Sequence, residues 1–143
     1  MLKKIVSCVL VLLVLSLPMA YAENTNLETP GSGSTAKWSY TSSTKTILSI
    51  SSAGKATCTG SLIGYQGTTT GVDIFLYLER YINGSWSTYP SGSWYQYFPT
   101  YQGVLSATIY VTSGYNYRLR ASYYANSGSN WENISSCSQT VYY

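Results

Sequence analysis

The feature that most constrains this chain is a period-two alternation of apolar and polar side chains that recurs from residue 36 onward. No ten-residue window beyond that point sustains a helical apolar period, so the pattern predicts strands. Turn signals containing Gly, Asn or Pro separate these strands at intervals of about ten residues. We therefore expect an all-β fold, an immunoglobulin/fibronectin-like antiparallel β-sandwich of about seven to nine strands. The predicted strands span residues 36–41, 46–51, 55–63, 72–81, 85–89, 93–98, 104–112, 115–124 and 137–142.

The alternation also assigns inner faces to the strands, because successive side chains point to opposite sides of a sheet. Residues that share these inner faces are the candidates for the core. They are Ala56, Cys58, Gly60, Leu62, Ile74, Leu76, Leu78, Leu105, Ala107, Ile109, Val111, Tyr115, Tyr117, Leu119, Ala121 and Tyr123.

Two local signals predict details of the sandwich. Asn83-Gly84 lies between two predicted strands and favours a type I′ hairpin turn, which requires positive φ at both central positions. In immunoglobulin-like domains, a tyrosine early in the penultimate strand bonds back to the upstream backbone. Tyr117 or Tyr115 has the position to do this.

The first 22 residues are typical of an export signal. Lys3 and Lys4 precede a run of thirteen mainly apolar residues, and Ala20-Tyr21-Ala22 follows as a small-residue cleavage site. At ~1.5 Å per residue this run covers about 20 Å of a ~30 Å hydrocarbon core, so we expect no stable membrane anchor. We therefore predict a signal peptide at 1–22, a flexible polar leader at 23–35, a β-sandwich domain at 36–143, and a secreted, extracellular protein.

Two cysteines remain after removal of the signal, Cys58 and Cys137. Since export leads to an oxidising compartment, a single Cys58–Cys137 disulfide is predicted. The alternative is a pair of free thiols, because sequence alone does not place their Cα atoms within bridging distance.

The composition leaves few groups for catalysis. Histidine is absent and the chain has only five carboxylates, so zinc sites and histidine-dependent nucleophiles lack their residues. Asp73 and Glu79 lie six residues apart on one strand, about 20 Å, which exceeds the separation in glycosidases. Glu79 with Glu132 stays open as a carboxylate pair, the alternative being two solvated acids. We expect no enzyme activity, no cofactor and no metal.

The charge balance also argues against nucleic acid as a partner. Without Lys3 and Lys4, six basic residues face five acidic ones, a net charge of +1. Nucleic-acid binding depends on clustered Lys and Arg that neutralise many phosphates.

The segment from Tyr81 to Tyr101 holds eight aromatic residues in 21 positions. Trp94 and Phe98 share one face of the predicted strand 93–98, and Tyr95 and Tyr97 share the other, so some rings must lie at a surface. The strands 72–81 and 115–124 are neighbours in immunoglobulin-like topology, and alternate residues on each point away from the core. These outward residues form a predicted ligand-binding surface. Its residues are Phe75, Tyr77, Glu79, Tyr81, Arg118, Arg120 and Tyr124.

Rings flanked by Arg and carboxylate groups suit sugars, whose C–H faces stack on aromatic side chains. The alternative is that these side chains only stabilise the sheet through cross-strand pairs.

Five segments are distinctive when taken together: Gly54-Lys55-Ala56-Thr57-Cys58, Gly64-Tyr65-Gln66-Gly67, Leu76-Tyr77-Leu78-Glu79-Arg80-Tyr81, Gly84-Ser85-Trp86 and Gly114-Tyr115-Asn116-Tyr117-Arg118. With them, the chain resembles an uncharacterised family of small secreted single-domain β-sandwich proteins of Gram-positive anaerobic bacteria. The resemblance implies a signal peptide followed by one sandwich domain. It implies no activity and no functional residues.

The sequence thus favours a secreted, non-enzymatic binding module with an extracellular polysaccharide as partner. A protein-interaction or self-associating structural module is the second hypothesis, with the same surface or an open edge strand as contact. A small secreted toxin or bacteriocin is the third.

Overall fold

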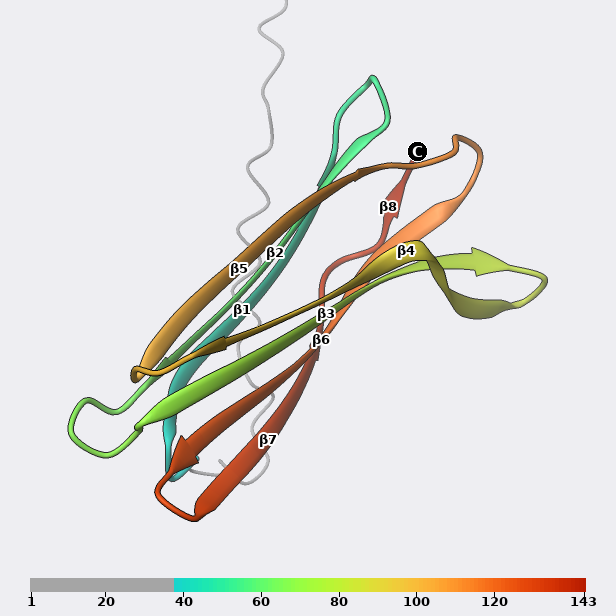
Figure 1. The fold of residues 1–143 in the computed structure, drawn as a ribbon. Helices are drawn as coiled ribbons and strands as arrows, with labels where there is room; N and C mark the ends of the chain where they lie inside the picture. The colour runs from blue at the N-terminus through green and yellow to red at the C-terminus, as the bar shows by residue number, and fades with distance from the viewer. Residues whose placement is uncertain (1–37) are drawn as a thin grey trace, which may run out of the picture. The chain divides into compact units, whose positions relative to one another are not determined.

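The computed structural model describes residues 38–143, which form eight strands and no helix. The strands pair in two antiparallel sheets, one in the order β1-β2-β5 and one in the order β4-β3-β6-β7, with β8 also pairing with β6 (Figure 1). The strands are β1 (Thr41–Ile50), β2 (Lys55–Gly64), β3 (Gly71–Ile82), β4 (Ser85–Phe98), β5 (Gln102–Tyr110), β6 (Asn116–Ser127), β7 (Asn130–Cys137) and β8 (Val141–Tyr142). The prediction of an all-β fold is confirmed. The predicted signal peptide and leader lie outside the described residues.

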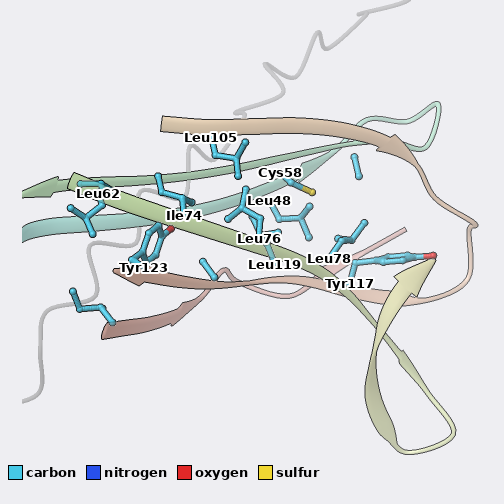
Figure 2. Packing of buried hydrophobic residues seen from close by; sticks show 14 of the residues in the cluster. Leu48, Cys58, Leu62, Ile74, Leu76, Leu78, Leu105, Tyr117, Leu119 and Tyr123 are labelled. Atoms are coloured by element: carbon cyan, nitrogen blue, oxygen red, sulfur yellow. The ribbon is translucent and has the colours of Figure 1, made fainter. Parts of the chain in front are cut away.

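One apolar core joins the two sheets (Figure 2). Most of the predicted inner-face residues are buried in it, while Ala107, Ile109 and Tyr115 are half-buried. The core also contains Leu48, Val72, Ala125 and Ile134, which were not predicted. The alternation of β2, β3 and β6 therefore gave the correct inner faces.

Tyr123 connects the two sheets through its buried hydroxyl group. This group donates a hydrogen bond to the carbonyl oxygen of Lys45 on β1 and accepts one from the Thr46 hydroxyl, both at 2.7 Å. Gly60 on β2 leaves room for this approach, because a Cβ atom there would lie 2.9 Å from the Tyr123 hydroxyl and 2.6 Å from Cδ2 of Leu76. Burial raises the pKa of Tyr123, so the hydroxyl stays protonated and able to donate.

Both local signals adopt the predicted geometry. Asn83 and Gly84 have φ values of 52° and 80°, as a type I′ turn between β3 and β4 requires. The hydroxyl of Tyr117, near the start of β6, donates to the carbonyl oxygen of Thr112 at 2.6 Å. Tyr117 rather than Tyr115 makes the predicted backbone bond.

Strand β4 differs from the prediction of two strands separated by a turn. It is continuous from Ser85 to Phe98, and the expected turn at 90–92 is a bulge inside it. Four residues, 89–92, lie opposite Leu78 alone, since Thr88 pairs with Glu79 and Ser93 with Tyr77. This irregularity uses a positive φ of 57° at Ser91. Gly92 permits close contact, because a Cβ atom there would lie 3.1 Å from Cβ of Leu78.

The bulge inserts three extra residues, an odd number, and therefore reverses which side of the strand faces outward. Trp86 lies opposite Tyr81 on the outer face, whereas Trp94 lies opposite the buried Leu76 and packs against the core. Without the reversal, Trp86 and Trp94 would share one face of β4.

The ends of the domain also differ from prediction. Strand β1 is continuous from Thr41 to Ile50, where two strands were predicted, and residues 36 and 37 are not described. Strand β7 was not predicted. It is an edge strand, half of it Ser and Asn, in which Ile134 alone is buried, so it lacks the apolar alternation that identifies half-buried strands.

The predicted disulfide is wrong for this structure, in which Cys58 and Cys137 are both free thiols. Cys58 faces the core from β2 and is fully buried, whereas Cys137 is exposed and lies opposite Arg120 on the outer side of the other sheet. The two sulfur atoms therefore face different sides of that sheet. Burial raises the pKa of the Cys58 thiol to about 12, so this residue behaves as a small apolar side chain.

We predict that one thiol reacts in the folded protein. On the chain from Glu23 onward, which lacks Cys8, a chromogenic thiol reagent should label one cysteine rapidly and the second only after unfolding. Cys137→Ser should remove the rapid phase. Two rapid phases, or no free thiol in freshly purified protein, would contradict the assignment.

We also predict that Gly60→Ala lowers the free energy of unfolding by about 1 to 3 kcal/mol, because the new methyl group overlaps Leu76 and Tyr123. The matched control is Thr59→Ala, one residue earlier, where the side chain points away from the core and the cost should stay below about 1 kcal/mol. Urea denaturation of both variants measures the difference. Equal midpoints would show that the sheets are not in this close contact.

Candidate functional site

The outer face of the five-stranded sheet carries a continuous group of rings, two guanidinium groups and two carboxylates. We call it the aromatic face. Its members are Asp73, Phe75, Tyr77, Glu79 and Tyr81 on β3, Trp86, Tyr95 and Tyr97 on β4, Arg118, Arg120 and Tyr124 on β6, and Trp131 on β7. The register places Tyr77 opposite Arg120 and Glu79 opposite Arg118. All seven residues that the sequence predicts to point outward from β3 and β6 lie on this face.

Glu79 is the centre of an ion-pair cluster. Its Oε1 atom accepts a hydrogen bond from Nε of Arg120 and its Oε2 atom accepts one from Nε of Arg118, each at 2.7 Å. The glutamate is only 6% exposed although it lies on an outer face. Burial on its own raises the pKa of Glu79, but the bonds and charges of Arg120 and Arg118 outweigh it and hold that pKa below 4.5. The carboxylate is thus ionised near neutral pH.

Both arginines also lie over aromatic rings. The guanidinium carbon of Arg118 lies 4.4 Å from the centre of the Trp86 ring, and that of Arg120 lies 4.2 Å from the centre of the Tyr77 ring. These distances are typical of cation–π contacts. Each guanidinium plane is therefore fixed by two contacts, a ring face and a Glu79 oxygen.

The remaining rings touch one another across the strands. Phe75 stacks on Tyr95 with centroids 4.5 Å apart and meets Tyr124 edge-on at 5.8 Å. Tyr124 in turn lies 5.6 Å from Trp131 on β7. At the other end of the face, Tyr81 meets Trp86 edge-on at 5.2 Å. The rings thus reach from β4 across β3 and β6 to β7.

These contacts leave much of the ring area open to solvent. Tyr81, Tyr95, Tyr97 and Trp131 are 42%, 56%, 49% and 61% exposed, respectively. Exposed aromatic side chains that gather on one face in this way are typical of contact surfaces.

Asp73 lies at the Tyr97 end of the face. Its Oδ1 atom accepts a hydrogen bond from the Tyr95 hydroxyl at 2.8 Å and its Oδ2 atom accepts one from Nδ2 of Asn126 at 2.9 Å. The bond to the Asp73 carboxylate raises the pKa of Tyr95. Asp73 therefore holds the exposed Tyr95 ring in place through its hydroxyl.

Glu132 does not join Glu79. It lies opposite Ala125, a core residue, and therefore on the inner side of the sheet, whereas Glu79 is on the outer side. Its two oxygens accept the backbone N–H groups of Ser39 and Tyr40, each at 2.9 Å. In this structure Glu132 tethers the chain that leads into β1, and the carboxylate pair left open by the sequence is not assembled.

Sequence reasoning missed Trp86, Trp131 and the cross-strand role of Tyr95. The outward position of Trp86 follows from the two-residue Asn83-Gly84 turn, which places Trp86 opposite the outward Tyr81, so the hairpin signal could have found it. Trp131 lies on the unpredicted strand β7. The outward position of Tyr95 depends on the odd bulge in β4, which no local pattern indicates, because a regular strand continuing from the Asn83-Gly84 turn would place Tyr95 opposite the buried Val72.

Other features of residues 38–143 offer fewer groups for recognition. A shallow depression beside the turn between β4 and β5 is lined by Ser61, Leu62, Ile63, Phe98, Gln102, Gly103 and Val104, none of which was predicted as a site residue. Within this part of the chain, no three His, Cys, Asp or Glu side chains gather into a set that could hold a metal ion. The described residues also contain no helix of the length and apolarity needed to cross a membrane. Comparison of the chain with protein-family models, curated proteins and solved structures finds no match.

The lowered pKa of Glu79 predicts a specific loss of stability in acid. Ionised Glu79 contributes to the free energy of unfolding above its ordinary pKa of 4.5, and this contribution is lost as pH falls through the lower pKa of the folded state. At pH 7, Glu79→Gln should cost about 1 to 3 kcal/mol, since its amide NH₂ group cannot accept one of the two arginine hydrogen bonds and its uncharged oxygen accepts the other more weakly. Urea unfolding from pH 7 to pH 3 should show the gap between the two proteins closing below pH 4.5. A constant gap would contradict the lowered pKa.

Proposed function

We propose that this chain is a secreted, non-enzymatic binding module that holds an extracellular polysaccharide on the aromatic face. The observation that carries the proposal is the gathering of rings on one face of the sheet, four of them solvent-exposed, around two fixed guanidinium groups. Sugar rings stack their C–H faces on aromatic side chains, while their hydroxyl groups bond to charged donors and acceptors. A flat face suits a polymer, which lies along it, better than a small molecule that requires enclosure.

The strand order supports an immunoglobulin/fibronectin-like topology for this module. The third and sixth strands, β3 and β6, are neighbours in one sheet, and the first, second and fifth strands form the other. Strand β4 joins the sheet of β3 and β6, as the additional strands of some immunoglobulin-like domains do. The bond from Tyr117 to the Thr112 carbonyl supports the same topology.

The main objection is that aromatic pairs also stabilise sheets on their own. Rings with only that role would be expected to cover one another, yet Tyr95 and Trp131 at the two sides of the face remain more than half exposed. Their open area is available for a ligand and contributes nothing to the sheet, which favours recognition.

A protein partner or a second copy of the chain is the other candidate, and strand β4 favours it. This strand is 14 residues long and lies at an edge of its sheet, where unpaired backbone groups are able to pair with another chain. Size-exclusion chromatography distinguishes the two candidates, because self-association through β4 predicts a dimer in the absence of polysaccharide.

We predict that Tyr81→Ala and Tyr77→Ala each weaken polysaccharide binding by about 1 to 2 kcal/mol, because stacking area is lost, with a smaller effect on stability. The matched control is Tyr110→Ala. Tyr110 is 69% exposed on β5 of the other sheet, so its removal should leave binding unchanged. Calorimetric affinity for a polysaccharide retained in pull-downs and the melting temperature of each variant are measured together.

Two results would overturn the proposal. One is that no polysaccharide from a broad panel of cell-wall and plant polymers is retained. The other is that the two variants lose thermal stability without losing affinity, which would leave the rings with a role in the sheet alone.

A further inference from the structure

Arg118 and Arg120 use only part of their hydrogen-bonding capacity within the sheet. Each donates to Glu79 through Nε, and among the described residues neither terminal Nη group has an acceptor. A guanidinium group carries five N–H donors, so four remain on each arginine. The side chains are 29% and 37% exposed, which leaves these donors accessible from solvent.

The nearby carboxylate of Glu79 does not neutralise both arginines. Glu79 is buried, and each of its oxygens bonds to one arginine. With one negative and two positive charges, the cluster of Glu79, Arg118 and Arg120 has a net charge of +1. Asp73 keeps its negative charge, because the two groups that donate to its oxygens, from Tyr95 and Asn126, are neutral. It lies six positions from Glu79 along β3, about 20 Å. The part of the aromatic face around Arg118 and Arg120 therefore offers positively charged donors to solvent.

The two guanidinium groups are also pre-organised. Their residues are two positions apart on β6, about 7 Å, and each plane is held against a ring, Trp86 for Arg118 and Tyr77 for Arg120. A fixed guanidinium fork matches the paired oxygens of a carboxylate or sulfate and loses little side-chain entropy on binding them. A hydroxyl group presents one oxygen and uses such a fork less completely.

We infer that the ligand of the aromatic face is an anionic polysaccharide, with carboxylate or sulfate groups bound by Arg118 and Arg120 and sugar rings stacked on the neighbouring aromatic side chains. This inference rests on the proposed function and adds the chemical class of the ligand.

The test uses two polymer pairs that differ only in charge. One pair is polygalacturonate and its carboxyl-reduced derivative, and the other is carrageenan and its desulfated derivative. Affinity electrophoresis of the purified protein at 20 mM and 200 mM NaCl should show at least tenfold tighter binding to the anionic member of at least one pair. That preference should shrink at the higher salt concentration, because salt screens exposed charges. The pair that shows it distinguishes carboxylate from sulfate.

Variants of the protein test whether the anion is bound by the guanidinium group itself or attracted by net charge alone. Arg120→Gln should weaken binding of the anionic polymer at least tenfold, whereas Lys45→Gln, which removes the same charge from an exposed position on β1 of the other sheet, should change it less than twofold. Arg120→Gln leaves Glu79 with one partner, so the double variant Glu79→Gln/Arg120→Gln is included. It keeps the cluster at a net charge of +1 and should still lose at least threefold in affinity for the anionic polymer.

The outcomes distinguish the inference from the proposed function. Equal binding of both members in both pairs, with binding still weakened by Tyr81→Ala, would overturn the inference and leave polysaccharide binding intact. Equal losses in Arg120→Gln and Lys45→Gln would also overturn it, since net charge would then explain the preference. Retention of none of the four polymers overturns the inference, and the broad panel of polymers then decides the proposed function separately.

Discussion

The aromatic face depends on one buried carboxylate. Arg118 and Arg120 are two positions apart on β6, and without a counter-charge their side chains would repel each other at the centre of the sheet. Glu79 binds both of them, one with each oxygen. Burial of an ion is costly unless its oxygens are bonded, and here two short charge-assisted bonds offset that cost. The arginines then lie against Trp86 and Tyr77, so that one side chain fixes two guanidiniums and two rings.

The bulge in β4 connects the fold to this surface. Trp86 lies opposite Tyr81 beside the hairpin turn, on the outer side, where it contacts Arg118. The three extra residues that follow reverse the facing of the strand, so that Trp94 packs against the core and Tyr95 points outward. The close approach of Gly92 to Leu78 permits the bulge. The bulge thus places the two tryptophans of β4 on opposite faces, which a regular strand of this sequence could not do.

The sequence predicted what depends on local alternation and not what depends on distant contacts. Strands β3 and β6 alternate without interruption, so their inner residues and all seven predicted surface residues were placed correctly. The outward positions of Tyr95 and Tyr97 could not be predicted, because they depend on the bulge at residues 89–92, where Gly92 lies against Leu78. Strand β7 was missed because it pairs along an edge with little burial. The disulfide was predicted from the cysteine count and the export signal alone. Neither of these indicates in which direction the side chains of Cys58 and Cys137 point.

The other outer face of the domain shows that the rings are not a general requirement of these sheets. On β2 and β5, the central outward positions of the three-stranded sheet hold short hydroxyl side chains, namely Thr57, Thr59, Ser61, Ser106 and Thr108. Thr59 and Ser106 hydrogen-bond across the strands at 3.1 Å. Larger exposed side chains on this face, Ile47, Ile63, Val104 and Tyr110, include a single aromatic ring. The centre of an outer face in this fold therefore does not require rings. Since both sheets share one core, their different outer faces do not follow from packing of that core, and the concentration of rings and guanidiniums on one of them is what the proposed binding role would require.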